Sequence, residues 1–411
     1  MSATDLLPID EIQRPRNREE LVQCVKSCWE QERAMYPLGG ETALEFGVPA
    51  QVAGVGISLA EINQVVEFPA RDLTVTVEAG TPMASLNKTL GEEGLSLPLH
   101  VPDVERATVG GVVAANANGP ARYGMGTVRD YVIGIHAVDG SGTAFQGGGR
   151  VVKNVAGYDF CKLLTGSLGT LAIIDQVTFK LKPKPEKWIS LLCSLPDWDQ
   201  AENCLAALVD SETTPTAVEL LSGPTEIELV AELQGDGVAV LVVSCCGTAA
   251  EVDWMQQQLE QEWQAQGLSA RVVTDTDHEA LWQDLVEFPT VAPTALALQA
   301  NMVPSGVVGF IREVQAVEPQ FSIKAHAGNG VVLCRMPELP TIGLTEIVIR
   351  RLQPLARQYA GNVMVLSAVG SKELTQRCVW GGTEMPFDLM GRIKEQFDPR
   401  NLLNPGRFVY P

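Results

Sequence analysis

The sequence predicts an α+β protein with two domains and a C-terminal segment that returns to the first of them. Three observations support this. Strictly alternating stretches such as "LTVTVEAG" lie between helical patterns in the glycine-rich first 185 residues. The stretch "LKPKPEK" marks a boundary, and a strand–helix–strand–strand–helix–strand order follows it. The expected divisions are residues 1–185, 186–375 and 376–411.

The first division opens with a helix. Apolar side chains recur at helical spacing over residues 17–31, and Asn17 is the expected N-cap. Residues 73–78 alternate apolar and polar side chains, which predicts a strand with one buried face. A further helix is expected to have Thr81 as its cap and Pro82 at its first position.

The second division has six expected elements. They are the strand "WISLLCSL", a helix over about 197–208, the strands "AVELLSG" and "GVAVLVVSCCG", a helix over about 249–264, and the strand "ARVVTD". This order predicts a ferredoxin-like domain, an antiparallel sheet covered by helices. The sequence shows no internal repeat.

Composition excludes several classes of function. The formal net charge of the 411 residues is -20 and the pI is near 4.6, which argues against nucleic acid or an anionic membrane as a partner. The N-terminus has no signal-peptide pattern, and no stretch predicts a membrane span. The nine cysteines are an odd number without framework or cluster spacing, which indicates reduced thiols in a cytoplasmic setting.

Three glycine clusters dominate the first division: "LGGET", "TVGGVVAANANGPARYGMG" and "GYDFCKLLTGSLG". Each by itself could be a tight turn. Together they favour a large phosphate-bearing cofactor lying along the backbone, because bare amides form concavities that bind phosphate. The chain has no GxxxxGK[ST] motif and no GxGxxG after a strand, so neither a P-loop nor a Rossmann site is predicted.

The order of these motifs resembles a known family. "YPLGGET", "TVTVEAGTPMASLN", the second and third glycine clusters and the closing "FDPRNLLNPGRF" resemble the FAD-binding domain of the vanillyl-alcohol-oxidase or PCMH type. Within that group the chain is most similar to the FAD-binding E subunits of bacterial glycolate dehydrogenases. The resemblance implies an FAD-binding domain of two α/β subdomains and a ferredoxin-like cap domain.

The resemblance also implies where FAD lies. The residues fall into a first phosphate loop, a second phosphate segment, a glycine run past the diphosphate and ribose, an adenine side, and a tail motif near the flavin ring. They are Leu38, Gly39, Gly40, Glu41, Thr42, Ala107, Thr108, Val109, Gly110, Gly111, Gly119, Tyr123, Gly124, Gly126, Gly157, Tyr158, Gly166, Gly169, Ile173, Asn404 and Arg407.

Two details qualify this site. The first loop carries Glu41 and Glu45 where relatives have basic or serine-rich stretches, and an acid beside a pyrophosphate is unfavourable unless it points away. No histidine occupies a position at which relatives attach FAD covalently. His100 is the nearest and is interpreted as a loop residue, so non-covalent FAD is expected.

The predicted chemistry is oxidation of a small 2-hydroxy acid, glycolate or D-lactate. Related dehydrogenases use a histidine-rich motif and a divalent metal, whereas the matching "AHAGNGVVLCR" has only His326, so no metal is expected. His326 is the candidate base or substrate-orienting residue, with a packed loop histidine as the alternative. Trp380 in "WGG" is expected to line the same pocket.

Three hypotheses remain open from the sequence. The first is a subunit of a glycolate dehydrogenase complex, with a second flavin subunit and an iron-sulfur subunit as partners. The second is a self-sufficient 2-hydroxy acid dehydrogenase. The third is a non-catalytic scaffold with this fold. The expected location is cytoplasmic, with membrane association only through partner subunits.

Overall fold

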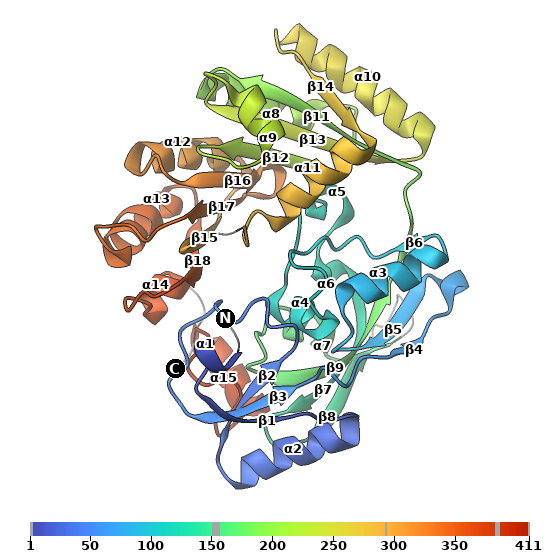
Figure 1. Ribbon diagram of the computed structural model, residues 1–411, viewed down its shortest axis with the longest axis vertical. Helices are drawn as coiled ribbons and strands as arrows, with labels where there is room; N and C mark the ends of the chain where they lie inside the picture. Colours follow the sequence, from blue (N-terminus) through green and yellow to red (C-terminus); the bar gives the residue numbers. More distant parts are fainter. Residues whose placement is uncertain (1–2, 150–156, 292–293, 383–386, 410–411) are drawn as a thin grey trace. The chain divides into compact units, whose positions relative to one another are not determined.

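The chain forms two compact units in a computed structural model that describes residues 3–149, 157–291, 294–382 and 387–409 (Figure 1). Unit 1 comprises Met1–Asn118, Gly126–Lys184 and Thr383–Pro411, and unit 2 comprises Gly119–Met125 and Pro185–Gly382. The short segment Gly119–Met125 therefore belongs to unit 2, although the residues on both sides of it in the sequence belong to unit 1.

The first part of unit 1 is a parallel three-stranded sheet in the order β1-β3-β2. Its elements are α1 (Ala3–Leu6), β1 (Ile9–Gln13), α2 (Arg18–Glu30), β2 (Ala34–Leu38) and β3 (Gly54–Ser58). Asn17 caps α2 as predicted, because its side chain accepts a hydrogen bond from the amide of Glu20 at 2.9 Å. The buried face of α2, with Leu21 and Val25, packs in the core of the unit against β2 and β7.

The second part of unit 1 is an antiparallel five-stranded sheet in the order β4-β5-β9-β7-β8. Its strands are β4 (Val65–Glu67), β5 (Thr74–Glu78), β7 (Val132–Asp139), β8 (Ala144–Gly148) and β9 (Ala172–Lys180). Around it lie the turn η1 (Ala70–Asp72), the helices α3 (Met83–Glu92), α4 (Val109–Ala115), α6 (Val128–Tyr131) and α7 (Phe160–Leu164), and the strand pair β6 (Leu95–Ser96) and β10 (Lys182–Pro183). Helix α4 packs on β5 and β9.

The start of α3 differs from the prediction. The helix begins at Met83, and the extended Pro82 occupies the cap position without a side-chain hydrogen bond. Pro82 forms an isolated antiparallel bridge with Thr108, and the carbonyl of Thr81 accepts the amide of Val109 at 2.9 Å. These contacts keep the chain extended through residue 82, so Thr81 does not cap the helix.

The C-terminal segment completes unit 1. Helix α15 (Phe387–Phe397) is followed by a stretch that pairs with the edge of β2, where the Met35 amide donates to the Leu402 carbonyl at 2.6 Å. Asp398 accepts the amides of Leu402 and Leu403 and also pairs with the buried ammonium of Lys394. The "FDPRNLL" stretch is thereby fixed against the parallel sheet.

Unit 2 is built on one antiparallel sheet of eight strands in the order β14-β11-β13-β12-β16-β17-β15-β18. The strands are β11 (Lys187–Leu195), β12 (Ala217–Ser222), β13 (Ala239–Gly247), β14 (Arg271–Thr274), β15 (Leu296–Asn301), β16 (Ser322–His326), β17 (Val331–Met336) and β18 (Asn362–Ala368). The helices are α5 (Arg122–Met125), α8 (Trp198–Asp210), α9 (Glu228–Gln234), α10 (Ala249–Ala265), α11 (Asp275–Glu287), α12 (Val307–Val317), α13 (Gln353–Gln358) and α14 (Gln376–Trp380), with the short turns η2 (Pro304–Gly306) and η3 (Ala327–Asn329) and the π-helix η4 (Thr345–Leu352).

The eight strands are two ferredoxin-like halves. Strands β11 to β14 pair in the order β14-β11-β13-β12, with α8 and α10 as the connecting helices, which confirms the ferredoxin-like order of elements. The predicted ferredoxin-like domain is, however, only one half of a larger sheet. Strands β15 to β18 repeat the same order of elements and the same pairing, and the halves meet where β12 pairs with β16. No pattern of residues marks this repeat in the sequence, because the two halves share only an order of elements.

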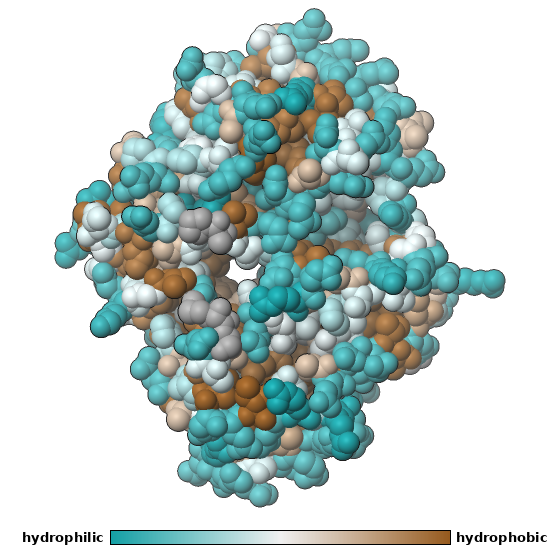
Figure 2. Space-filling model, viewed as in Figure 1, coloured by the Kyte–Doolittle hydropathy of each residue, from teal (hydrophilic) through white to brown (hydrophobic). Residues whose placement is uncertain are grey.

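Apolar side chains are gathered into separate cores in the described residues of each unit. One large cluster in unit 2 includes side chains of α8, α10, α12 and α13, and a smaller one joins α9 and α11 to the strands β11, β12 and β13. Hydrophilic residues cover most of the face seen in Figure 2. Of the helices described, none has the length and apolar character needed to cross a bilayer.

Candidate functional site

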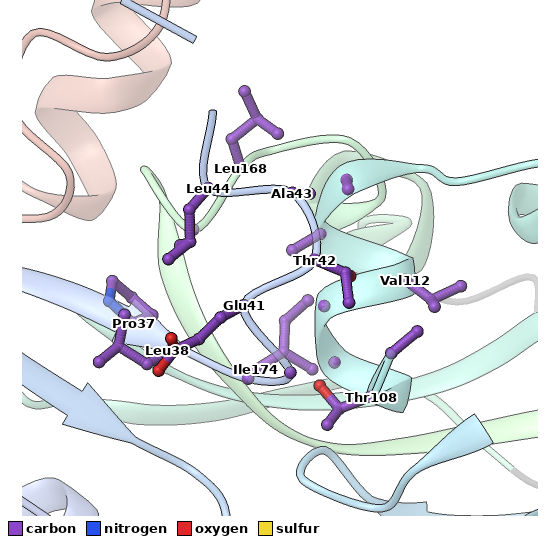
Figure 3. A pocket seen from close by; sticks show the side chains of 18 of the residues that line it. Pro37, Leu38, Glu41, Thr42, Ala43, Leu44, Thr108, Val112, Leu168 and Ile174 are labelled. Atoms are coloured by element: carbon purple, nitrogen blue, oxygen red, sulfur yellow. The ribbon is translucent and has the colours of Figure 1, made fainter. Parts of the chain in front are cut away.

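A cleft in unit 1 gathers most of the glycine-cluster residues. Loop 38–44 after β2, the first turn of α4, the start of β9 and the tail motif surround about 1110 Å³ of empty space, open solvent included (Figure 3). The predicted residues that line it are Leu38, Gly39, Gly40, Glu41, Thr42, Ala107, Thr108, Gly110, Gly111, Gly169, Ile173, Asn404 and Arg407. No histidine is among the described residues of its lining.

The first loop offers unused hydrogen-bond donors. Within the part of the chain that the structure describes, the amides of Gly39, Gly40, Glu41 and Thr42 donate to no protein acceptor. A Cβ atom on Gly40 would lie 1.7 Å from the Arg106 carbonyl oxygen, so only glycine allows this close approach. Successive free amides of this kind bind phosphate oxygens.

The start of α4 adds a hydroxyl to these donors. Thr108 Oγ1 is buried in the cleft wall and has no hydrogen-bond partner in the described chain. Buried hydroxyls are seldom left unpaired in native proteins, so this oxygen indicates a polar ligand atom beside it. The donors on loop 38–44 and on α4 together fit a diphosphate.

The acidic side chain of Glu41, which is unusual for this loop, points away from α4 (Figure 3). Glu41 has a positive φ of 60°, and its carboxylate accepts a hydrogen bond from the amide of Ala3 at 3.0 Å. Figure 3 shows this side chain on the side of the loop away from α4, whereas Thr42 lies next to the helix. The carboxylate therefore ties the loop to α1 and does not stand between the free amides and the Thr108 hydroxyl.

The tail motif fastens the loops of the cleft. The Asn404 side-chain amide donates to the Leu168 carbonyl at 2.7 Å. The Arg407 guanidinium donates to the carbonyls of Leu44 and Phe46 at 2.5 and 2.8 Å. Burial lowers the pKa of Arg407 to about 10, so the group stays charged at neutral pH. These contacts show Asn404 and Arg407 as supports of the loops around the cleft.

Several predicted residues lie elsewhere. Val109, Gly126, Gly157, Tyr158 and Gly166 belong to unit 1 but not to the described cleft lining, and Tyr158 is 86% exposed. Gly119, Tyr123 and Gly124 belong to unit 2. The stretch 150–156, which directly precedes the third glycine cluster, lies outside the described residues.

Sequence reasoning missed the apolar wall of the cleft. Leu44, Phe46, Leu59, Ala79 and Val101 line it. Ligand pockets are commonly lined by apolar side chains with a few polar groups among them. These residues belong to no recognisable motif, and the glycine clusters that predicted the site do not include them.

In unit 2 the structure pairs His326 with Glu219 at the joint between the two halves of the sheet. The two residues are cross-strand partners on β16 and β12, and His326 Nδ1 lies 2.7 Å from Glu219 Oε1. Both side chains are buried, and burial lowers the pKa of His326 despite the carboxylate beside it. The sequence did carry a signal for Glu219, a lone charge in the apolar strand "AVELLSG".

Lys324 completes this pair as a third buried group. Its ammonium lies 3.9 Å from Glu219 Oε2 and donates to the Leu285 carbonyl. Burial lowers the pKa of Lys324 to about 8. Among the described residues, no group of three or more histidine, cysteine, aspartate or glutamate side chains could hold a metal ion.

Trp380 is not brought to His326. It ends α14, which packs on β18, and its carbonyl accepts the side-chain amide of Asn362 at 3.1 Å. Strands β16 and β18 are separated by β17 and β15. Three strand spacings of about 4.8 Å put roughly 14 Å between them. The structure therefore does not group the two predicted catalytic residues.

Comparison with known proteins decides the family. The model of the FAD-binding domain matches residues 9–148, and the model of the C-terminal domain of FAD-linked oxidases matches residues 184–319 and 382–408. The chain belongs to the FAD-linked oxidases. FAD is the cofactor of this family, and the free amides and the unpaired Thr108 hydroxyl of the cleft fit its diphosphate.

Relatives of this FAD-linked oxidase match nearly its whole length. The glycolate oxidase subunit GlcD of Bacillus subtilis is 26% identical, over 97% of this chain and 88% of its own. A D-lactate dehydrogenase of Archaeoglobus fulgidus is 28% identical, over 96% and 90%. A D-2-hydroxyglutarate dehydrogenase of Xanthomonas citri pv. viticola is 28% identical, over 96% and 88%. The solved structure of an alkyldihydroxyacetonephosphate synthase has the same fold, with a TM-score of 0.68 at 17% identity, over 96% of this chain and 76% of its own.

Proposed function

We propose that this FAD-linked oxidase oxidises a small 2-hydroxy acid, glycolate or D-lactate, to the 2-oxo acid. The observation that carries the proposal is that three relatives, matched over nearly the whole chain, are named for glycolate, D-lactate and D-2-hydroxyglutarate. Bound FAD supplies the acceptor for the hydride that leaves C2 of the substrate. The residues of this chain must position the acid and remove its hydroxyl proton.

His326 is the proposed base. Its Nδ1–H donates to Glu219, so the lone pair of the neutral ring lies on Nε2. Burial lowers the pKa of His326, which keeps the ring neutral and able to accept a proton near pH 7. The carboxylate of Glu219 then stabilises the imidazolium that forms when the substrate hydroxyl gives up its proton.

A His326→Gln variant tests this role. Losing a positioned base lowers kcat by about 10²- to 10⁴-fold. His136→Gln is the matched control, because His136 is a partly buried histidine of unit 1 on β7. Rates of anaerobic flavin reduction by glycolate and D-lactate are the measurement. Equal rates in wild type and the His326 variant would remove the base from the proposal.

We propose further that the chain works as the FAD-binding subunit of a glycolate dehydrogenase complex, passing electrons to a second flavin subunit and an iron-sulfur subunit in the cytoplasm. The resemblance to E subunits supports this. In addition, Val331, Val332 and Leu333 are buried at the start of β17, where the metal-dependent motif would place a further histidine. A base working without a metal favours slow turnover by the chain alone.

Turnover of glycolate and D-lactate with an artificial dye separates the alternatives. The chain alone is expected to be slow, and the chain co-expressed with its genetic neighbours fast. Rapid turnover by the isolated chain, unaffected by partners, would favour a self-sufficient dehydrogenase. A pure protein without flavin colour that neither acid reduces would favour a scaffold.

A further inference from the structure

The segment Gly119–Met125 has a role that its sequence context hides. It lies inside the second glycine cluster, yet it belongs to unit 2. The amide of Gly124 donates to the Thr216 carbonyl at 2.9 Å, just before β12 begins. A Cβ on Gly124 would stand 2.6 Å from the Pro215 carbonyl oxygen, so glycine is required for helix α5 to lie this close.

Helix α5 also contacts the turn that follows His326. The ring of Tyr123 lies against Gly328, where a Cβ would come within 2.2 Å of the ring. Helix α5 therefore contacts the strand β12, which carries Glu219, and also the turn η3, which follows His326. This position brings Arg122, the first residue of α5, to the same cluster.

Arg122 is a cation whose hydrogen-bond donors are unused. Its Nε is buried without a hydrogen-bond partner, and the guanidinium makes no hydrogen bond or ion pair within the described chain. Burial lowers the pKa of Arg122 and the charge of Glu219 raises it, so the two groups act on each other. An arginine remains protonated under all ordinary conditions.

The other cation of the cluster is already engaged. Lys324 donates to the Leu285 carbonyl, faces the ring of Phe288 and stands beside Glu219. The cluster thus contains two positive charges, on Arg122 and Lys324, and one negative charge, on the carboxylate of Glu219. The imidazole of His326 is neutral. One positive charge is left without a counter-ion, and burying such a charge is costly unless an anion joins it.

We infer that Arg122 binds the carboxylate of the substrate, which rests on the proposed oxidation of a 2-hydroxy acid. The planar guanidinium can hold a carboxylate through two parallel hydrogen bonds. In a 2-hydroxy acid the hydroxyl-bearing carbon is bonded directly to the carboxylate, so the anchor and the base must be neighbours. Arg122 and His326 meet this requirement, because α5, which begins at Arg122, contacts the turn η3 directly after His326 and the strand β12 that pairs with it.

Binding of oxalate to the FAD-loaded protein, measured by calorimetry, tests the anchor without turnover. Arg122→Gln is expected to weaken oxalate binding by about 10- to 100-fold, the effect of losing a charged hydrogen-bonded pair. Arg122→Lys keeps the charge but loses the planar fork, and an intermediate loss is expected. Arg129→Gln is the matched control, because it removes one positive charge from an exposed arginine seven residues along the chain.

Glycolate and its amide, glycolamide, supply a second readout. Wild type is expected to be reduced anaerobically by glycolate far better than by glycolamide, and Arg122→Gln should lose most of that preference. If Arg122→Gln folds, retains FAD and binds oxalate like wild type, Arg122 is only a partner of Glu219 and the inference is wrong. If wild type is not reduced by any 2-hydroxy acid, the proposed function itself fails.

Discussion

Gly111 offers a clean test of where FAD binds. This residue lies in the first turns of α4, lines the cleft and is exposed. A Cβ placed on it meets only Thr108 Oγ1, at 3.3 Å. A Cβ on the neighbouring Gly110 would stand 2.7 Å from the Ala79 Cβ. A side chain at 111 therefore enters the cleft, whereas one at 110 enters the core.

The two consequences of Gly111→Val differ in size. Valine has a better helix propensity than glycine by a few tenths of a kcal/mol, so the free energy of unfolding should change by less than about 0.5 kcal/mol. Overfilling a packed site costs about 1–3 kcal/mol. If FAD lies along this backbone, its dissociation constant should rise by about 5- to 150-fold.

Flavin fluorescence titration of the apoprotein gives the dissociation constant, and urea unfolding gives the stability. Gly91→Val is the matched control, because Gly91 is an exposed glycine of helix α3 with nothing within 4 Å of its Cβ position. Gly110→Val is expected to lower stability itself. Wild-type FAD affinity in a stable Gly111→Val protein would show that the diphosphate does not lie against α4.

Burial lowers the pKa of His278 to about 4, so its contribution to stability is present above the unfolded value of 6.5 and is lost as pH falls toward 4. Wild type should lose about 2 kcal/mol more than His278→Gln between pH 7 and pH 5 in urea unfolding, and parallel curves would contradict this. Asn404→Ala removes the bond to Leu168 at a residue with a φ of 44°, so a loss of about 1–2 kcal/mol and weaker FAD binding are expected from the same assays. Unchanged values would mean that the tail does not support the cleft. Acid precipitation should release all flavin to the supernatant, and flavin in the pellet would indicate a covalent bond. Elemental analysis should find no stoichiometric iron, because the cysteines lack cluster spacing, and one cluster's worth of iron would overturn that.

Local patterns in the sequence determined much of this molecule. Asn17 caps α2 through its own side chain, and the capping box of Thr248 and Glu251 starts α10, because such signals act over one helical turn. The glycine clusters indicated a phosphate-bearing ligand, since bare backbone has few other uses at that density. The ferredoxin-like order of β11 to β14 likewise followed from hydrophobic periodicity alone.

Other features depended on contacts between distant segments. The pairing of β12 with β16 joins the two halves of the sheet and brings Glu219 to His326, which lie 107 residues apart in the chain. Arg122 lies in the second glycine cluster, which the sequence assigns to the cofactor site. The hydrogen bond of Gly124 to Thr216 instead joins this segment, Arg122 included, to unit 2. Charge at a buried cluster is set by which side chains meet there. That information exists only once the strands have paired, so the sequence determined the cofactor class and the tertiary structure decided the neighbours of the histidine.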